Sequence, residues 1–155
     1  MLFRSGVGVI GITQDIYNVG NNQQVNNVLK VGVDTTKYNA TNHNSYYAGA
    51  GIELGRLNAS EDYLLSFMAR SAGADKNLRL QFKTPRGEND FSYTDVSKNL
   101  IKISREPKTY TLKLGTIHTD NRKVSLVFNQ TGSDNSDKKE FLKDFYLDKD
   151  RKSVV

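Results

Sequence analysis

Cysteine and tryptophan are both absent from the sequence, and histidine occurs only twice. Without cysteine the chain can form no disulfide, no thiolate metal site and no cysteine nucleophile. Nothing in the sequence places His43 and His118 beside a third nitrogen or carboxylate ligand, so a histidine-based zinc site is not expected. Without tryptophan the chain has no indole ring, which is the strongest aromatic platform for stacking on a ligand.

Long apolar runs are also lacking. No window approaches the roughly 18 apolar residues that a membrane-spanning helix needs, so no membrane insertion is expected. The N-terminal apolar stretch is too short for a signal peptide, and we interpret it as an opening strand. A chain of 155 residues can bury one core without disulfides. We therefore expect a single domain over residues 1–148 and a charged tail at 149–155.

Positive charge is not concentrated anywhere along the chain. Lysine and arginine number 22 against 17 acidic residues, which gives a net charge of +5. Residues 1–60 hold four basic and three acidic side chains, and residues 61–155 hold 18 and 14. A nucleic-acid-binding protein usually gathers its basic residues on one face. No nucleic-acid partner is therefore expected.

Catalytic motifs are missing as well. The sequence contains no G-x-S-x-G, no H-E-x-x-H and no phosphate-binding glycine loop. Acidic pairs such as Asp134 with Asp137 fall in turn-forming stretches, where solvated acids are common, and glycoside hydrolysis needs two carboxylates held across a cleft. The sequence predicts a protein that is not an enzyme.

What the sequence does contain is alternation with period two. Residues 63–71 place Tyr63, Leu65 and Phe67 on one side of a strand, and residues 77–83 repeat the pattern. At least five segments alternate in this way, and about nine strand-like segments separated by turn signals predict an all-β fold, an antiparallel β-sandwich. The predicted core residues are Tyr63, Leu65, Phe67, Leu80, Phe82, Tyr110, Leu112, Leu126 and Phe128.

The segments 63–71 and 77–83 are separated by a short connection and are predicted to pair as a hairpin. Their polar residues would then share one outer face, which is either an ordinary solvated surface or the floor of a ligand groove. The residues predicted for this face are Ser66, Met68, Arg70, Arg79 and Gln81.

The order of motifs across residues 46–148 resembles one family. The series Y-L-L-S-F-M-A-R-S, L-R-L-Q-F, K-T-Y-T-L-K-L, V-S-L-V-F and F-L-K-D-F-Y-L is similar to that of jelly-roll carbohydrate-binding modules of the galactose-binding-like kind. The Asn-rich segment that precedes this series and the sequence E-D-Y-L-L-S-F-M-A-R-S resemble the versions of this module carried by tail and baseplate proteins of phages of Gram-positive bacteria. The resemblance implies a jelly roll.

Two departures from the family pattern matter. Pro107 and Lys108 stand where the family often has tryptophan. The family commonly holds a structural calcium with an Asp-Asp pair in the last strand, but here Lys143 replaces the first aspartate and only Asp144 is left. An ammonium group can occupy the place of the ion, so we expect calcium to be absent or displaced, and no other cofactor.

The resemblance also implies a saccharide ligand. Sugar recognition uses flat aromatic faces and planar polar groups. The candidates are Arg70, Arg79 and Gln81 on the predicted outer face, together with Tyr46, Tyr47, Phe91 and Tyr93 near loops. Each aromatic residue, taken alone, can equally serve core packing.

The sequence thus favours a non-catalytic module that attaches a larger assembly, such as a phage tail or baseplate, to a cell-surface saccharide. Its location would be extracellular or in a virion, and its partners would be the saccharide and other subunits of the assembly. Two alternatives stay open. One is a structural adaptor or spacer that binds protein, and the other is an accessory module of a secreted glycoside hydrolase.

Overall fold

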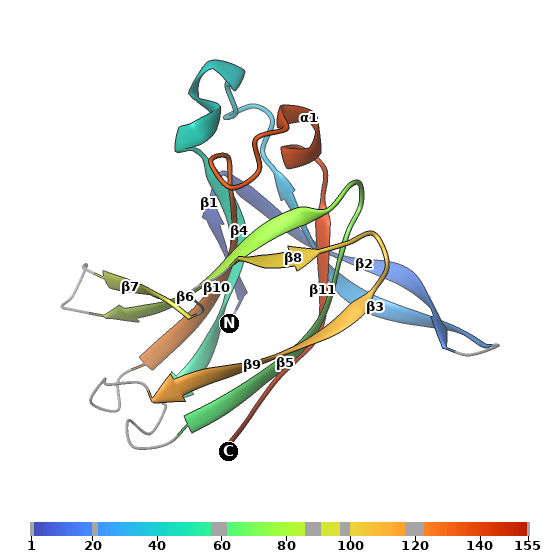
Figure 1. The fold of residues 1–155 in the computed structure, drawn as a ribbon, viewed down its shortest axis with the longest axis vertical. Helices are drawn as coiled ribbons and strands as arrows, with labels where there is room; N and C mark the ends of the chain where they lie inside the picture. Colours follow the sequence, from blue (N-terminus) through green and yellow to red (C-terminus); the bar gives the residue numbers. More distant parts are fainter. Residues whose placement is uncertain are drawn as a thin grey trace.

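The computed structural model describes residues 2–19, 22–56, 62–85, 91–96, 100–116 and 123–154. Two sheets of antiparallel strands pack face to face and form a β-sandwich (Figure 1). The predicted fold class is confirmed.

The six-stranded sheet has the order β1-β4-β10-β6-β7, and β8 pairs with β6. Its strands are β1 (Leu2–Gly6), β4 (Tyr47–Arg56), β6 (Lys76–Pro85), β7 (Phe91–Asp95), β8 (Ile101–Ile103) and β10 (Lys123–Thr131). The five-stranded sheet has the order β2-β3-β11-β5-β9. Its strands are β2 (Gly8–Val19), β3 (Asn22–Val33), β5 (Asp62–Ser71), β9 (Lys108–Thr116) and β11 (Phe145–Val154).

The core lies between the sheets and is made by the alternating residues that the sequence indicated. Tyr63, Leu65 and Phe67 project inward from β5, while Leu80 and Phe82 project from β6 to meet them. Of the other predicted core residues, two are buried and two pack against the core from half-buried positions: Leu126, Phe128, Tyr110 and Leu112. The predicted core is confirmed.

The predicted hairpin of residues 63–71 and 77–83 is wrong. β5 belongs to the five-stranded sheet and β6 to the six-stranded sheet, so the connection between them crosses from one layer to the other. Ser71 N donates to Ser104 O at 2.8 Å and Ala72 N donates to Asp144 O at 2.9 Å, which fixes the start of the crossing. Two strands that each have one apolar side can bury it in either of two ways: as neighbours in one sheet, or as members of opposite sheets that face each other. Period-two alternation is the same in both arrangements and cannot distinguish them.

The described residues include two short helices, which lie at the same end of the sandwich (Figure 1). They are the 3₁₀ helix η1 (Ala40–Ser45) and the single turn α1 (Lys138–Phe141). The Asp137 side chain caps α1 by accepting from the amides of Lys139 and Glu140. No described helix has both the length and the apolar composition that crossing a membrane requires.

Candidate functional site

The structure divides the predicted binding residues between opposite sides of the sandwich. Because β5 and β6 lie in different sheets and each turns its apolar side to the core, their polar sides point away from each other. Arg70 therefore lies on the outer face of the five-stranded sheet, and Arg79 and Gln81 lie on the outer face of the six-stranded sheet. The single groove floor predicted from Ser66 to Gln81 does not exist.

On the five-stranded sheet, Arg70 is held in a defined position. Its Nε donates to Asp15 Oδ2 at 2.5 Å and its Nη2 donates to Asp15 Oδ1 at 2.9 Å. The guanidinium also lies 4.1 Å from the centroid of the Tyr146 ring. The side chains of Arg70 and Asp15 are only 20% and 14% exposed. This bidentate pair is geometrically specific, and the aromatic contact fixes the guanidinium plane.

The Arg70–Asp15 pair shows that the outer face of this sheet is concave. Asp15 lies on β2, and both β3 and β11 stand between β2 and β5. Three strand spacings amount to about 14 Å, which is farther than the two side chains reach across a flat sheet. The long β2–β3 hairpin must therefore curl over the outer face, and it projects beyond the rest of the sheet (Figure 1). We call this concave surface the Arg70 face. Its residues are Asp15, Asn26, Ser66, Met68, Arg70, Tyr146 and Asp148.

Two buried polar atoms of the Arg70 face have no hydrogen-bond partner. They are Asn26 Nδ2 and Asp148 Oδ2. Asn26 is the cross-strand partner of Asp15, and Asp148 follows Tyr146 by two residues, so strand geometry puts both on the same side as Arg70. Buried polar groups in native proteins are nearly always paired. A ligand hydroxyl, which both donates and accepts, can satisfy a donor and an acceptor of this kind.

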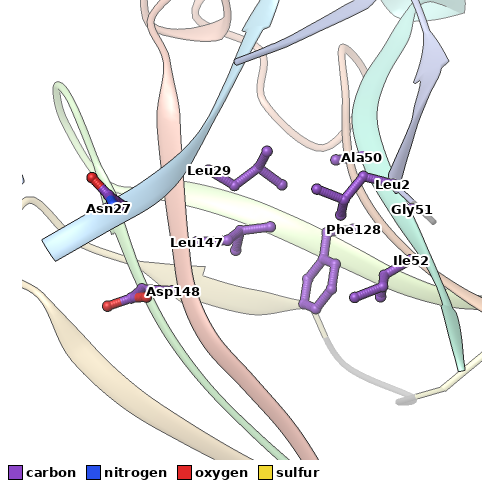
Figure 2. Close-up of a pocket in the computed structure, with 9 residues that line it drawn as sticks. All are labelled: Leu2, Asn27, Leu29, Ala50, Gly51, Ile52, Phe128, Leu147 and Asp148. Atoms are coloured by element: carbon purple, nitrogen blue, oxygen red, sulfur yellow. The ribbon is translucent and has the colours of Figure 1, made fainter. Parts of the chain in front are cut away.

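A cleft of about 210 Å³ lies between the two sheets (Figure 2). Figure 2 shows Asn27 and Asp148 at one end, where the pairing of β3 with β11 stops at Leu29–Leu147, and apolar side chains at the other. The apolar part of the lining comes from Leu2, Leu29, Ala50, Ile52, Phe128 and Leu147. Such walls offer few partners to a polyhydroxylated ligand, so the cleft is not our candidate saccharide site.

Three of the predicted residues meet on the other side of the molecule. Tyr47, Arg79 and Gln81 line a hollow on the outer face of the six-stranded sheet. Tyr46 does not join them, because its ring packs 5.3 Å from that of Tyr38 beside a small second core and its hydroxyl accepts from the amide of Asn39.

Phe91 and Tyr93 cannot be placed in either surface. Their backbone lies in β7, where Phe91 pairs with Pro85 and Tyr93 with Lys83. Their side chains lie outside the described part of the chain, so their role in binding stays a prediction.

The segment that precedes β11 surrounds a buried ammonium group. Lys76, which is 2% exposed, places Nζ among four oxygen acceptors. These are Gln130 Oε1 at 2.7 Å and the backbone carbonyls of Glu140 at 2.9 Å, Phe141 at 3.4 Å and Lys143 at 2.7 Å. Burial lowers the pKa of Lys76 to about 8, although the negative charges of Glu140 and Asp144 oppose this effect.

This arrangement bears on the structural calcium that the family pattern implies and that we expect to be absent or displaced. Lys76 supplies the ammonium next to Asp144, whereas the Lys143 side chain turns away to Glu140 Oε1 at 2.8 Å. A calcium ion would need the same carbonyl oxygens that already accept from Lys76, and the two cations would repel each other. Asp144 itself lies near Lys30, with Nζ 4.0 Å from Oδ2. The residues around Lys76 therefore do not fit a calcium ion at this position.

No metal-binding cluster appears among the described residues. They contain no group of three or more histidine and acidic side chains that could hold a metal ion. His43 is buried, with Nδ1 2.8 Å from the Tyr38 hydroxyl and Nε2 2.8 Å from Asn135 O, so its ring joins η1 to the loop before α1. His118 lies outside the described residues.

Sequence reasoning missed the residues that complete these surfaces. Asp15, Asn26 and Tyr146 join the Arg70 face, and Asn129 joins the hollow beside Tyr47. The position of Tyr146 could have been predicted, because it stands between the inward-pointing Phe145 and Leu147 and must therefore point outward. No sequence pattern indicated Asp15 or Asn26, since only the curl of the β2–β3 hairpin brings them near Arg70.

Comparison with known proteins supports the fold. No protein-family model and no curated protein matches the sequence. Similar solved structures include the xylan-binding CBM22-2 domain of Xyn10C from Paenibacillus barcinonensis, with a TM-score of 0.63 and 12% identity over 99% of this chain and 91% of that one. Another is a family 11 carbohydrate-binding module from Clostridium thermocellum in complex with a β-1,3-1,4-mixed-linked tetrasaccharide, with a TM-score of 0.59 and 12% identity over 100% and 87%.

A third similar structure is the enzymatically active domain of tailspike protein 4 of bacteriophage CBA120, with a TM-score of 0.61 and 11% identity. The match covers 100% of this chain but 19% of that one. At such identities the likeness establishes the fold: the β-sandwich is a jelly roll of the kind found in carbohydrate-binding modules.

Proposed function

We propose that this protein is a non-catalytic carbohydrate-binding domain whose ligand lies on the Arg70 face. One observation carries the proposal: the concave face combines the Arg70–Asp15 pair with a buried donor, Asn26 Nδ2, and a buried acceptor, Asp148 Oδ2, that lack partners. Jelly-roll modules of similar structure that bind xylan or a mixed-linked tetrasaccharide support the ligand class.

The chemistry of the face suits hydroxyl groups. Pairs of neighbouring hydroxyls match planar groups such as guanidinium and carboxylate, because both present two polar atoms at fixed spacing. Asp15 balances the charge of Arg70, which favours a neutral or weakly anionic saccharide over a polyanion. The Ser66 and Thr111 hydroxyls, 3.0 Å apart on β5 and β9, extend the polar surface away from Arg70.

We further propose that the domain serves adhesion, attaching a phage tail or baseplate to a cell-surface saccharide of the host. The likeness to a tailspike domain supports this setting. An accessory module of a secreted hydrolase is the second candidate, because one similar structure from Clostridium thermocellum joins a CBM22-1 module to a GH10 module in complex with xylohexaose.

The test is a glycan array that includes xylohexaose, mixed-linked glucan oligosaccharides and wall polysaccharides of Gram-positive bacteria, followed by titration calorimetry with the best ligand. We expect Arg70→Ala to weaken binding by about tenfold or more, since a hydrogen bond to a charged group contributes roughly 1.5–3 kcal/mol. Lys102→Ala removes the same charge from an exposed site on β8 and should bind like wild type.

The remaining outcomes each decide something. Equal binding by wild type and by a folded Arg70→Ala variant would remove the Arg70 face from consideration. Failure of the wild type to bind any glycan would favour the structural adaptor. Release of reducing ends from the bound polysaccharide would show that the domain is catalytic. Tyr93→Ala in the same assay tests the predicted contribution of the β7 segment.

A further inference from the structure

The cleft between the two sheets follows from the way the strands separate. In the described part of the chain, the pairing of β3 with β11 stops at Leu29–Leu147, and the β2–β3 hairpin projects beyond the rest of the sheet (Figure 1). The opposite wall, on β4, carries the small side chain of Ala50, which fills little of the space left between the sheets. The cleft is therefore bounded by β1, β4 and β10 on one side and by β3 and β11 on the other (Figure 2).

This cleft has a closed floor and an open mouth. Ala50, Phe128 and Leu147 are buried and form the floor. Leu2 is 43% exposed, which places the mouth beside it. A small molecule can thus enter from solvent and bury most of its surface against residues of both sheets.

The walls fit one apolar ring or a branched alkyl group. An apolar cavity of about 150 Å³ lined by leucine, isoleucine and phenylalanine is large enough to bind benzene. The cleft has a volume of about 210 Å³ and walls of the same residue types, so it has room for such a ring and a short substituent. Water in the apolar part finds few hydrogen-bond partners, and an apolar group that displaces it gains affinity.

The polar end of the cleft contains a carboxylate oxygen without a donor. Figure 2 shows Asn27 and Asp148 together at this end, and both line the cleft. Asp148 Oδ2 is buried and accepts no hydrogen bond. The ammonium of Lys30, on the neighbouring strand, lies near Asp144, with Nζ 4.0 Å from Oδ2. Carboxylates form their strongest hydrogen bonds with cationic donors, so an ammonium group on the ligand suits this end best.

We propose that this cleft binds a small organic amine, with its apolar group between Ala50, Phe128 and Leu147 and its ammonium group on Asp148 Oδ2. This site goes beyond the saccharide proposal and does not rest on it, because it is measured without any glycan. Asp148 also belongs to the Arg70 face, so a bound amine competes with a saccharide hydroxyl for the same oxygen. Because the amine contacts both sheets, its binding stabilises the folded sandwich.

The experiment is a titration of the 155-residue chain, ¹³C-labelled in its leucine and isoleucine methyl groups, followed by two-dimensional NMR at pH 7. The probes are benzylamine, benzyl alcohol and benzoate, which share one ring and differ in charge. Benzylamine should shift the methyl signals of Leu29, Ile52 and Leu147 saturably, with a Kd of about 1 mM. Benzyl alcohol should bind about tenfold more weakly because its donor is uncharged, and benzoate should not saturate these signals because Asp148 repels it.

Variants test the two ends of the cleft separately. Ala50→Leu fills the floor and should abolish binding of benzylamine and benzyl alcohol alike. Asp148→Asn should weaken benzylamine by about tenfold, to the level of benzyl alcohol. Asp75→Asn is the matched control, since it removes the same charge from an exposed position just before β6, and it should bind like wild type. Leu2→Ala should weaken binding by about threefold, and it keeps the test decisive even when Ala50→Leu fails to fold, because Leu2 is exposed.

Three results would overturn the proposal. The first is that benzylamine saturates none of the three methyl signals, or saturates signals only elsewhere in the domain. The second is that benzyl alcohol binds as tightly as benzylamine. The third is that the folded Asp148→Asn and Asp75→Asn variants bind benzylamine equally well.

Discussion

Replacing Lys76 with methionine tests how the end of the sandwich near α1 is held together. Methionine keeps much of the apolar stem of lysine but removes the ammonium. Three of the surrounding oxygens lie within 2.9 Å of Nζ, namely those of Gln130, Glu140 and Lys143. In the variant these acceptors lose their common donor, although Glu140 O still accepts from the Lys143 amide at 3.1 Å.

The size of the effect follows from two opposing contributions. A hydrogen bond to a charged group contributes roughly 2 kcal/mol, so the loss of these three bonds costs about 6 kcal/mol. Removing the ammonium recovers the cost of burying its charge. That cost is roughly 3 kcal/mol, because the pKa of Lys76 falls from 10.5 to about 8. The net expectation at pH 7 is a loss of about 3 kcal/mol in the free energy of unfolding.

The pH dependence gives this reasoning a second and sharper prediction. Between about pH 8 and 10.5 the folded state has released the Lys76 proton while the unfolded state still holds it. The unfolded state then binds more protons, so the free energy of unfolding of the wild type rises with pH, by up to about 3 kcal/mol from this group. Lys76→Met lacks this rise, and the gap between the two proteins should widen from pH 7 to pH 10.

Thermal unfolding followed by circular dichroism measures both effects. A loss of about 3 kcal/mol lowers the Tm of a domain of this size by roughly 6–12 °C. Lys143→Met is the control. Its side chain is 48% exposed and its ammonium pairs with Glu140, so a change below about 1 kcal/mol is expected. A Tm fall under about 2 °C for Lys76→Met, or a gap that narrows at high pH, would refute the assignment.

Three further predictions concern other features. Gly6→Ala should lower the free energy of unfolding by about 2 kcal/mol or more, because its φ is 58° and its Cβ would meet Tyr47 O at 2.1 Å; urea unfolding measures this. Asp134→Asn should lower the free energy of unfolding by about 1 kcal/mol at pH 7 and by progressively less as pH falls. The pKa of Asp134 is lowered in the folded state, so its carboxylate stabilises the fold only while it is charged; unfolding at pH 7 and pH 3 measures this. A calcium chelator should leave the Tm unchanged within about 1 °C, since Lys76 occupies the available oxygens.

Each of these has a contrary result. Wild-type stability in Gly6→Ala would mean that the turn relaxes without strain. An Asp134→Asn deficit that persists undiminished at pH 3 would assign its effect to packing rather than charge. A Tm that falls by several degrees with chelator and recovers with calcium would place an ion elsewhere in the domain.

The sequence was sufficient for the fold class and the core because both depend on local alternation. Leu65 and Phe67, or Leu80 and Phe82, must point to the core in any arrangement of strands that buries one face. The sheet to which a strand belongs is a different matter. The sheet to which β6 belongs depends on whether residues 72–75 form a turn within one sheet or pass from one sheet to the other. The backbone contacts that hold this segment come from Ser104 and Asp144, which are far away in the sequence.

The prediction of one groove shared by residues 63–71 and 77–83 is wrong for the same reason. Arg70 and Arg79 were assigned to one surface through the expected hairpin, and the crossing places them on opposite surfaces. The partners that position them, Asp15 and Asp134, are each 55 residues distant along the chain. Long-range ion pairs of this kind leave no mark on local periodicity, so neither the pairing nor the curl of the β2–β3 hairpin was predictable.

The crossing has a consequence for binding. In a hairpin, polar residues of β5 and β6 would line one groove and their contributions to affinity would be coupled through shared ligand contacts. Here the core separates Arg70 from the hollow lined by Tyr47, Arg79 and Gln81, and packed sheets lie about 10 Å apart before their outer side chains are added. Contributions from sites at such distances add nearly independently. We therefore expect a ligand bound on one face to leave the affinity of the opposite face unchanged.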